Sequence, residues 1–379
     1  MSKGTAILRQ QNEKRTLSLL RIRGTSSRQE IAKALGLSKN TISLIVDKFL
    51  KEGIVQEVGI DENGGVGRPR IRLRLVPESY KTIGLLVGSR QCQYVVTDYV
   101  SSVLEKGTLA MDFREPVQAL EAIGRLCARL LALHPEALGV GVAVPGLVDP
   151  EQGLLRFATN LGWRNVRIRE TLGSKLNVPV RVMNKVKASA LAPAFEMPAG
   201  EAGSAFYVSI DEGVGGALLI HGQIYHGASW TAGEIGHICV DPDGPVCSCG
   251  QRGCLEALVR LPVLKERLLL AADGAGEDLP FPLVIDRHEG SAAVRETLRA
   301  AGEYVGAAIT QVVNLFNPEH IVINSPLHRS DSFRQAVADT LAGRALSIPG
   351  ETVKLHFIHN ELLPAIGAGA AIILDFERE

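Results

Sequence analysis

The densest group of metal-binding side chains in the sequence lies between residues 237 and 254. Cys247, Cys249 and Cys254 form a C-x-C-x4-C pattern, and His237 stands ten residues before it. One imidazole and three thiolates complete a tetrahedral zinc set and leave no position for a catalytic water. The alternative is a group of three inert buried cysteines, but the chain holds only six cysteines in all. The spacing therefore predicts one structural zinc ion per chain.

The other cysteines, Cys92, Cys127 and Cys239, are expected in the core. Six cysteines in 379 residues are too few for a disulfide scaffold, which favours a reducing compartment. No apolar run approaches the ~20 residues of a membrane span, and the first residues lack the apolar core and cleavage site of a secretory signal. We therefore expect a cytoplasmic protein with no membrane span.

A second group of polar side chains has the chemistry needed to read DNA bases. In the major groove, Asn can pair with adenine and Lys with guanine. Side chains of this kind begin a predicted helix, on the face opposite Ile42 and Ile45. They are Ser38, Lys39, Asn40, Thr41 and Ser43.

Two further segments of the chain suit contacts with DNA outside the major groove. Ser27 and Arg28 begin the preceding helix, where backbone N–H groups and the helix dipole favour a phosphate. Arg68 and Arg70 flank a proline and form a stiff, cationic finger suited to a narrow minor groove. Residues 1–80 carry 15 Lys and Arg against 8 Asp and Glu, in a chain with no net charge. This basic excess favours a partner that is a polyanion, double-stranded DNA, over a helical bundle with a merely polar surface.

Three helices and a β-hairpin are predicted to position these side chains. The helices cover Asn12 to Arg23, a segment that opens at Ser27 with a capping-box Glu30, and Lys39 to about Glu52. Strands at residues 54–58 and 70–75 flank a glycine-rich loop. This order predicts a winged helix-turn-helix over residues 1–76, followed by a linker at residues 77–81.

The remaining residues predict an α/β body of two lobes, because a set of strands and helices is followed by a second similar set. Predicted strands cover residues 82–87, 93–98, 103–110, 137–144, 205–210 and 216–221. Predicted helices cover residues 117–133, 255–271, 291–314 and 332–341.

Several motifs resemble those of the ROK family of repressors, open reading frames and kinases. The resemblance extends over nearly the whole chain, and its strongest element is Gly233-Glu234-Ile235-Gly236-His237 followed by the three cysteines and Leu255-Glu256. Two further motifs are similar to family sequences, and a glycine-alanine ending is similar but weaker. They are Pro145-Gly146-Leu147-Val148-Asp149, Asn160-Leu161-Gly162-Trp163 and Gly367-Ala368-Gly369-Ala370.

The resemblance implies an actin-like body built from a duplicated ribonuclease H-like fold, with a sugar cleft between its lobes. This body would occupy residues 82–379, one lobe formed by about 82–195 with the C-terminal helix 365–379, and the other by about 196–364. A winged helix with a Gly-Arg-Pro wing resembles the regulator branch, which includes repressors of xylose and N-acetylglucosamine genes. The kinases of the family usually lack that head.

The sequence departs from the kinases of the family at four positions. The usual Asp-x-Gly-Gly-Thr is replaced by Leu86-Val87-Gly88-Ser89-Arg90. The second phosphate loop, usually Gly-Thr-Gly-x-Gly, reads Asp211-Glu212-Gly213-Val214-Gly215. The usual Asn-Asp, whose Asp is the general base, is Asn184-Lys185. A lysine ammonium cannot accept the sugar proton near pH 7. The adenosine turn also reads Asn324-Ser325-Pro326, and we therefore predict no catalytic residues and no enzyme activity.

The family pattern implies a better preserved set of sugar-facing residues. Carboxylates and amides suit vicinal hydroxyls because they accept or donate in pairs. The alternative for Glu234 and Glu256 is a partner for a neighbouring ligand residue or a solvated surface acid. Lys185 could neutralise one of these acids or select an anionic sugar phosphate or sugar acid. The implied ligand-binding residues are Asn160, Asn184, Lys185, Glu234, His237 and Glu256.

Together these observations predict a zinc-containing transcriptional regulator, a repressor of carbohydrate uptake or catabolism genes. Its expected partners are a double-stranded DNA operator, a small sugar or sugar derivative, and further copies of itself in a homodimer or homotetramer. One alternative is a sugar kinase with an appended DNA-binding head. A second alternative is a regulator that is controlled by a protein partner and has no small-molecule effector.

Overall fold

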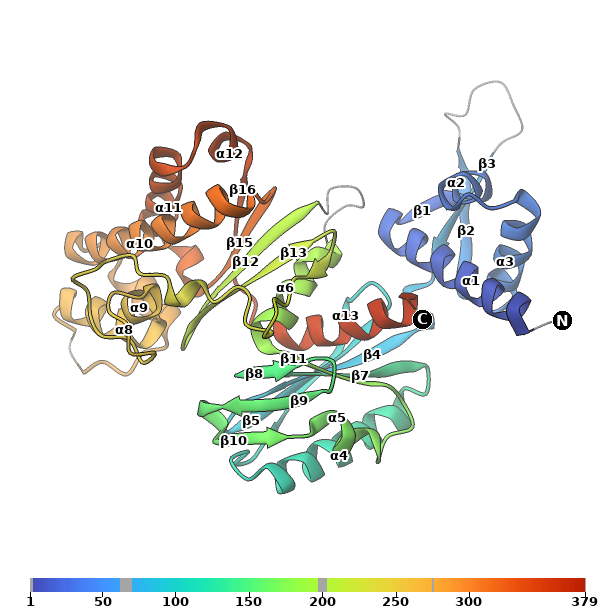
Figure 1. Cartoon of the computed structure of the whole chain (residues 1–379), viewed down its shortest axis with the longest axis horizontal. Helices are drawn as coiled ribbons and strands as arrows, with labels where there is room; N and C mark the ends of the chain where they lie inside the picture. Colours follow the sequence, from blue (N-terminus) through green and yellow to red (C-terminus); the bar gives the residue numbers. More distant parts are fainter. Residues whose placement is uncertain (1–2, 62–69, 197–202, 275, 379) are drawn as a thin grey trace. The chain divides into compact units, whose positions relative to one another are not determined.

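A computed structural model describes residues 3–61, 70–196, 203–274 and 276–378 (Figure 1). The chain forms two compact units, one of Met1–Glu201 with Leu362–Glu379 and the other of Ala202–Glu361. Among the described residues, no helix combines the length and apolar character that a membrane crossing requires. The first unit contains the N-terminal head, the first lobe and the C-terminal helix.

The head is a three-helix bundle with a small antiparallel sheet, as predicted (Figure 1). Its first helix begins at Lys3, well before the predicted Asn12, and its sheet has a third strand at residues 25–27 that was not predicted. A strand of three residues is too short to show the alternation that identifies longer strands. The elements are α1 (Lys3–Arg23), β1 (Thr25–Ser27), α2 (Arg28–Leu35), α3 (Lys39–Lys51), β2 (Val55–Asp61) and β3 (Arg70–Leu75).

The first lobe is built on a five-stranded sheet in the order β11-β7-β4-β5-β6. Strands β4, β5 and β6 form an antiparallel meander, and β7 and β11 continue the sheet in parallel with β4. The elements are η1 (Pro77–Ser79), β4 (Lys81–Val87), β5 (Gln91–Asp98), β6 (Val103–Ala110), α4 (Pro116–Leu133), β7 (Ala137–Val144), β8 (Leu147–Asp149), β9 (Leu154–Ala158), η2 (Thr159–Leu161), β10 (Trp163–Val166), α5 (Ile168–Gly173), β11 (Val180–Asn184) and α6 (Lys185–Glu196).

The C-terminal helix α13 (Leu363–Arg378) returns to this lobe and lies against the sheet (Figure 1). Two glycines of the sheet allow the close approach. A Cβ on Gly84 would lie 1.9 Å from the carbonyl oxygen of Ala365, and one on Gly141 would lie 1.9 Å from that of Ala368. Any larger residue at either position would push the helix off the sheet.

The second unit repeats the topology of the first lobe. Its sheet has the order β14-β13-β12-β15-β16, again with three antiparallel strands followed by two parallel ones. This repetition confirms the predicted duplicated α/β body. The elements are β12 (Ser204–Ile210), β13 (Val214–Ile220), β14 (Gln223–Ile224), η3 (Ile235–His237), α7 (Leu255–Val259), α8 (Leu261–Ala271), α9 (Phe281–His288), α10 (Ala292–Phe316), β15 (His320–Asn324), η4 (Pro326–Arg329), α11 (Asp331–Arg344), α12 (Ser347–Thr352) and β16 (Lys354–Ile358).

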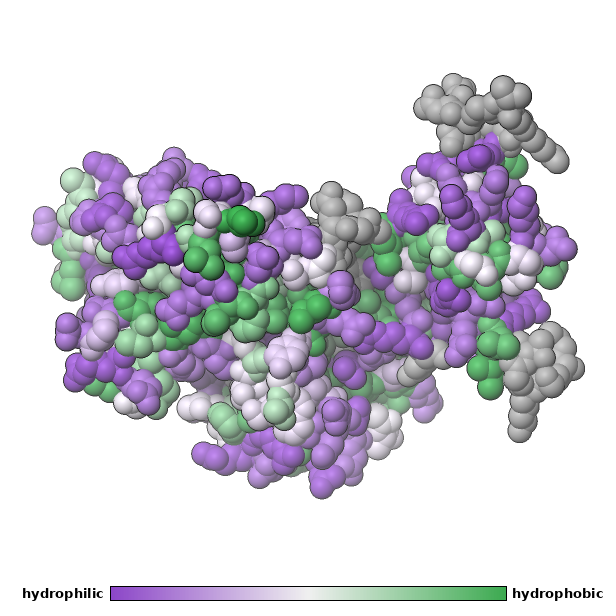
Figure 2. Space-filling view, turned by 45° about the horizontal axis from the view of Figure 1, so that its top comes forward, coloured by the Kyte–Doolittle hydropathy of each residue, from purple (hydrophilic) through white to green (hydrophobic). Residues whose placement is uncertain are grey.

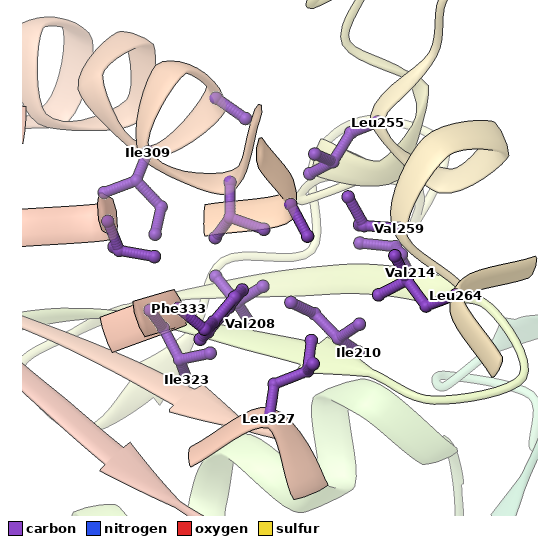
Figure 3. Close-up of a cluster of buried hydrophobic side chains, with 14 of the residues drawn as sticks. Val208, Ile210, Val214, Leu255, Val259, Leu264, Ile309, Ile323, Leu327 and Phe333 are labelled. Atoms are coloured by element: carbon purple, nitrogen blue, oxygen red, sulfur yellow. The ribbon is translucent and has the colours of Figure 1, made fainter. Parts of the chain in front are cut away.

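The core of the second unit lies between the strands and the helices α7, α8, α10 and α11. Figure 3 shows Val208 and Ile210 of the central strand facing side chains from these helices, among them Leu255 and Ile309. Each of these residues is at most 1% exposed. The packing fixes the positions of the two segments that carry Glu234, His237 and Glu256.

The predicted helix 255–271 is wrong in one respect, because it breaks at Arg260 into α7 and α8. Pro262 lies in the first turn of α8 and has no N–H to donate to the carbonyl of Leu258. The guanidinium of Arg267 donates to that carbonyl instead, at 3.3 Å. The break ends α7 one turn after Glu256.

Candidate nucleic-acid interface, metal centre and sugar-facing residues

The third helix of the head, α3, is held by a serine cap at its start. The Ser38 hydroxyl accepts from the backbone N–H of Thr41 at 3.1 Å, which satisfies one of the helix's open donors. Ile42 and Ile45 are at most 2% exposed and face the head's core. Lys39 and Asn40 are exposed on the other side, while Thr41 and Ser43 are half-buried.

The preceding helix, α2, begins with a complete capping box. The backbone N–H of Ser27 donates to the Glu30 carboxylate at 2.8 Å, and the Ser27 hydroxyl accepts from the N–H of Glu30 at 3.3 Å. Ser27 is buried, and its hydroxyl serves the cap. The next residue, Arg28, pairs with Asp47 of α3 at 2.7 Å and ties the two helices together.

Glu30 also joins α2 to the sheet of the head. Arg72 of β3 donates to the Glu30 carboxylate at 2.9 Å. The hydrogen bond from the Ser27 backbone, the Ser27 hydroxyl and the charge of Arg72 lower the pKa of Glu30 below its usual value. The carboxylate is therefore ionised at neutral pH and holds the wing strand against the helix pair.

The base of the predicted wing carries Arg70, which is exposed at the start of β3 and lies opposite Asp61. Arg68 lies outside the described residues. The space-filling view in Figure 2 shows that the head's visible surface is largely hydrophilic, with small hydrophobic clusters among the polar residues. A hydrophilic surface of this kind is compatible with a highly charged partner.

The head is joined to the C-terminal helix by a buried charge cluster. Arg21 of α1 makes two hydrogen bonds with the Glu377 carboxylate of α13, at 2.7 and 2.8 Å. Ser18 and the hydroxyl of Tyr99 donate to the same carboxylate at 2.9 and 3.0 Å. The Arg21 and Glu377 side chains are 8% and 6% exposed, so water screens the pair little.

Aromatic side chains surround this charge cluster. The rings of Tyr80, Tyr99 and Phe376 lie within 5.5 to 6.3 Å of one another, and the ammonium group of Lys14 lies 4.7 Å from the centre of the Phe376 ring. Tyr99 and Ile373 of the first lobe and α13 belong to the same hydrophobic cluster as the head's core. This junction could not be predicted from the sequence, because its members are far apart in the chain.

The predicted metal ligands come together in the second unit. The donor atoms of His237, Cys247, Cys249 and Cys254 lie within 4.8 Å of one another. The Cys249 and Cys254 sulfurs are 3.7 Å apart, and the Cys247 sulfur lies 3.7 Å from Nδ1 of His237. A tetrahedron with metal–sulfur bonds of ~2.3 Å has edges of about 3.8 Å, so the donor set fits a tetrahedral metal. Nδ1 of His237 faces the centre, which leaves Nε2 for another partner.

The three other cysteines do not share one environment. Cys92 and Cys127 are 0% exposed, as predicted, and burial raises the pKa of the Cys127 thiol to about 12. The expectation that Cys239 lies in the core is wrong, because this residue is exposed. Its neighbours Ile238 and Val240 pack against the core of the second unit, so the alternation of an extended segment turns Cys239 outward.

The residues of the first unit that were predicted to face a sugar have different surroundings. Asn160 is exposed in η2. The Asn184 side chain donates to the carbonyl of Gly146 at 2.8 Å and accepts from the N–H of Val186 at 2.8 Å. Asn184 therefore connects the loop at Pro145-Gly146 to the start of α6. Lys185 is half-buried at the first position of that helix.

The residues of the second unit that were predicted to face a sugar lie on both sides of the loop that carries the three candidate cysteine ligands. Glu234 is exposed and lines an apolar cavity of about 240 Å³. His237 is also exposed and follows Glu234 on η3. Glu256 is half-buried on α7, and its carboxylate accepts from the N–H of Val214 at 3.0 Å.

Backbone hydrogen bonds close both loops that the family resemblance relates to the kinase phosphate sites. In the first loop, the N–H of Gly88 donates to the carbonyl of Gln91 at 2.8 Å. In the second loop, the N–H of Asp211 donates to the carbonyl of Gly213 at 2.9 Å, and the N–H of Val214 donates to Glu256. These N–H groups already donate to the protein's own oxygen atoms. A phosphate could accept hydrogen bonds from them only by displacing those oxygen atoms.

Comparison with known proteins assigns the chain to a family. A model of the ROK family matches residues 82–374, and a model described as winged helix-turn-helix DNA-binding matches residues 9–56. The chain belongs to the ROK family. Its similarity to the xylose repressor of Caldicellulosiruptor bescii is 29% identity over 84% of each chain. The repressor Mlc of Escherichia coli is 26% identical, over 93% of this chain and 90% of Mlc.

Solved structures of ROK proteins have the same fold. A ROK family transcriptional regulator, described as a homologue of E. coli Mlc, superposes with a TM-score of 0.82 at 22% identity, covering 98% of this chain and 96% of its own. A ROK hexokinase from Thermus thermophilus superposes with a TM-score of 0.66 at 24% identity, covering 79% of this chain and all of its own. Both comparisons confirm the predicted fold of the body.

Proposed function

We propose that this ROK protein is a DNA-binding transcriptional repressor of carbohydrate genes that responds to a sugar or sugar derivative. The observation that carries the proposal is the outward face of α3, where Lys39 and Asn40 are exposed on a capped helix opposite the core. The relatives named xylose repressor and Mlc support the assignment, because they are similar over both the head and the body. We also propose a cytoplasmic location, because a repressor must reach its DNA operator.

The DNA-binding residues proposed are those of the two helix starts and the wing. The base-reading residues begin α3, and the others contact phosphates or the minor groove. Because Ser27 is buried in its cap, its contact with DNA would use the helix terminus and not the hydroxyl. The set is Ser27, Arg28, Ser38, Lys39, Asn40, Thr41, Ser43, Arg68 and Arg70.

The effector is proposed to contact the residues that the family pattern implies. Of these, Asn160, Glu234 and His237 are exposed, and Lys185 is half-buried. Asn184 and Glu256 make hydrogen bonds within the protein, so they would also position the loops around the sugar. Lys185 would favour an anionic sugar, such as a sugar phosphate or sugar acid.

A thermal-shift screen tests this effector class. The full-length chain is heated with neutral sugars, sugar phosphates and sugar acids, each at the same concentration. A ligand at 100 times its Kd stabilises the folded protein by about 2.7 kcal/mol. Loss of an anionic ligand's shift in Lys185→Gln, with neutral sugars unaffected, supports an anionic effector. The same ligand preference in both proteins contradicts the role of Lys185.

Zinc is the metal proposed for the site formed by His237 and the three cysteines. Three thiolates and one imidazole in a closed tetrahedral set match structural zinc, and the buried Cys247 and Cys254 anchor the loop to the core. Bound zinc would cross-link the loop between η3 and α7. His237 would present its other nitrogen to the effector or to a neighbouring carboxylate.

The chain is proposed to lack kinase activity. Lys185 stands where the family's kinases carry the catalytic Asp, and the closed loops described above offer no ready phosphate cradle. An assay for ADP release with hexoses and their N-acetyl forms tests this directly. Turnover above that of the buffer would favour the alternative, a kinase with an appended DNA-binding head.

We also propose that the repressor acts as a homodimer or homotetramer. Two heads related by symmetry would read a (pseudo)palindromic operator whose half-sites are about 10 bp apart or a multiple of that. Sedimentation at micromolar concentration measures the oligomeric state. A monomer that binds a single half-site with full affinity would contradict this proposal.

Capture of a protein partner together with an absence of any sugar-induced thermal shift would favour control by that partner.

A further inference from the structure

The outward face of α3 carries one large apolar side chain among polar ones. Leu44 is 68% exposed, whereas Ile42 and Ile45 on the opposite face are at most 2% exposed. It follows Asn40 by one helical turn and precedes Asp47 by another, so the three share one stripe. Single exposed leucines are ordinary on protein surfaces. This one stands in the middle of the surface that would enter the groove of DNA.

The chemistry of the major groove limits what Leu44 can contact there. Base edges present hydrogen-bond donors and acceptors, and one strongly apolar group, the C5-methyl of thymine. A leucine placed over donors and acceptors would leave them without partners, which is unfavourable. Contact with a thymine methyl removes apolar surface from water on both sides. We propose that Leu44 is a specificity-determining residue that contacts the methyl group of a thymine in the operator.

The geometry of the helix places this thymine relative to the other base contacts. Four residues of α-helix advance about 6 Å, which is close to two base-pair steps of ~3.4 Å. The thymine therefore lies one or two base pairs from the base that Asn40 reads. Asp47, one turn further along, is paired with Arg28 at 2.7 Å, and this pairing reduces its repulsion of the phosphates. This proposal rests on the proposed DNA binding and names what one residue of the interface reads.

The experiment begins with duplexes that the full-length chain enriches from a randomised pool. In the preferred duplex, each thymine is replaced in turn by deoxyuridine, which removes only the C5-methyl. Fluorescence anisotropy at fixed salt measures Kd for the wild-type chain, for Leu44→Ala and for Leu8→Ala. Leu8 is a matched control, because it is 62% exposed and lies on α1, outside the recognition helix.

The proposal predicts one position at which deoxyuridine weakens wild-type binding about 3- to 5-fold, the value of one buried methyl group. Leu44→Ala should bind the thymine duplex about as weakly and should no longer distinguish thymine from deoxyuridine at that position. Leu8→Ala should behave as the wild type. Equal losses in the wild type and Leu44→Ala at every thymine would overturn the role of Leu44 while leaving DNA binding intact. Failure to enrich any duplex would overturn the proposed function and this inference with it.

Discussion

The Glu30 side chain caps its own helix and also makes an ion pair with a residue far away in the sequence. Glu30 caps α2 through Ser27 and also binds Arg72 of the wing strand. Because the cap is local, the sequence pattern alone predicted it. The contact with Arg72 required the fold, since the two residues are separated by 42 positions. Leu44 could have been noticed in the sequence, because it is the one large apolar residue on an otherwise polar face of α3.

The lowered pKa of Glu30 predicts how the head responds to acid. A carboxyl group whose pKa is lower in the folded state stabilises the fold above its unfolded pKa, and this contribution disappears as pH falls through the folded pKa. Glu30→Gln keeps an amide oxygen for the capping box but removes the charge that strengthens the hydrogen bonds with Ser27 and Arg72. It should therefore destabilise the protein at pH 7 by roughly 1 kcal/mol, the difference between hydrogen bonds to charged and to neutral groups. The difference from wild type should shrink as pH falls below the unfolded pKa and should vanish once pH is below the lowered folded pKa.

Urea unfolding of the wild type and Glu30→Gln at pH 7 and at acid pH measures this difference. Glu57→Gln is the control, because Glu57 is an exposed carboxylate on β2 of the head. A Glu30→Gln effect of the same size at both pH values would show that packing, and not ionisation, accounts for the loss.

The proposed zinc ligands allow a second test on single residues. Cys254→Ser removes a buried ligand of the tetrahedral set. Its zinc content should fall from about one ion per chain to near zero, and its Tm should fall by roughly 4–8 °C, equivalent to ~2 kcal/mol. Elemental analysis and calorimetry measure the two effects. Cys239→Ser should keep both the metal and the Tm, and loss of zinc from this control would place the site elsewhere.

Among the elements, α13 has connections that its apolar sequence does not reveal. It covers the sheet of the first lobe through Gly84 and Gly141, and its last turn carries Phe376 and Glu377 to the head. Apolar periodicity predicted the three head helices but only six of the thirteen strands that the structure describes in the body. The family resemblance, and not periodicity, grouped the C-terminal helix with the first lobe. Its detailed packing depends on glycines and charges hundreds of positions away in the chain.

The buried Arg21–Glu377 pair allows the junction between α1 and α13 to be tested. Removing one partner of a buried pair leaves an uncompensated charge and typically costs 3–5 kcal/mol. We expect Glu377→Ala to destabilise the first unit by about that amount in urea unfolding. Glu170→Ala, which breaks an exposed pair with Arg167, should cost less than about 1 kcal/mol. Equal effects of the two changes would contradict the importance of the junction.

Substitution of Glu377 also tests whether effector binding in the body affects DNA binding by the head. Because α6 begins at Lys185 and packs against α13 through Gly367, a shift at the start of α6 has a continuous path to Glu377 and α1. We expect Glu377→Gln, which keeps the shape of the side chain and removes its charge, to weaken the effect of an effector on DNA affinity more than it weakens DNA binding itself. Anisotropy titrations with and without the effector separate the two.

At the scale of the whole molecule, a winged helix-turn-helix head is joined to a body with the fold of the ROK sugar kinases. A duplicated α/β body and a winged helix could both be predicted from motifs and alternation. The relation between the head and the first lobe, a charge and aromatic cluster in place of a simple linker, required the structure. A ligand that prefers one conformation by 1–3 kcal/mol changes operator affinity about 5- to 150-fold.

Operator affinity in the presence of sugars is the most direct test of this account. The full-length chain is titrated into an enriched duplex by fluorescence anisotropy at fixed salt, with no sugar and then with each neutral sugar, sugar phosphate and sugar acid in turn. We expect nanomolar-range binding that weakens as salt rises and at least one sugar that shifts Kd by about 5-fold or more. A Kd that is the same with every sugar would contradict control of operator binding by a sugar.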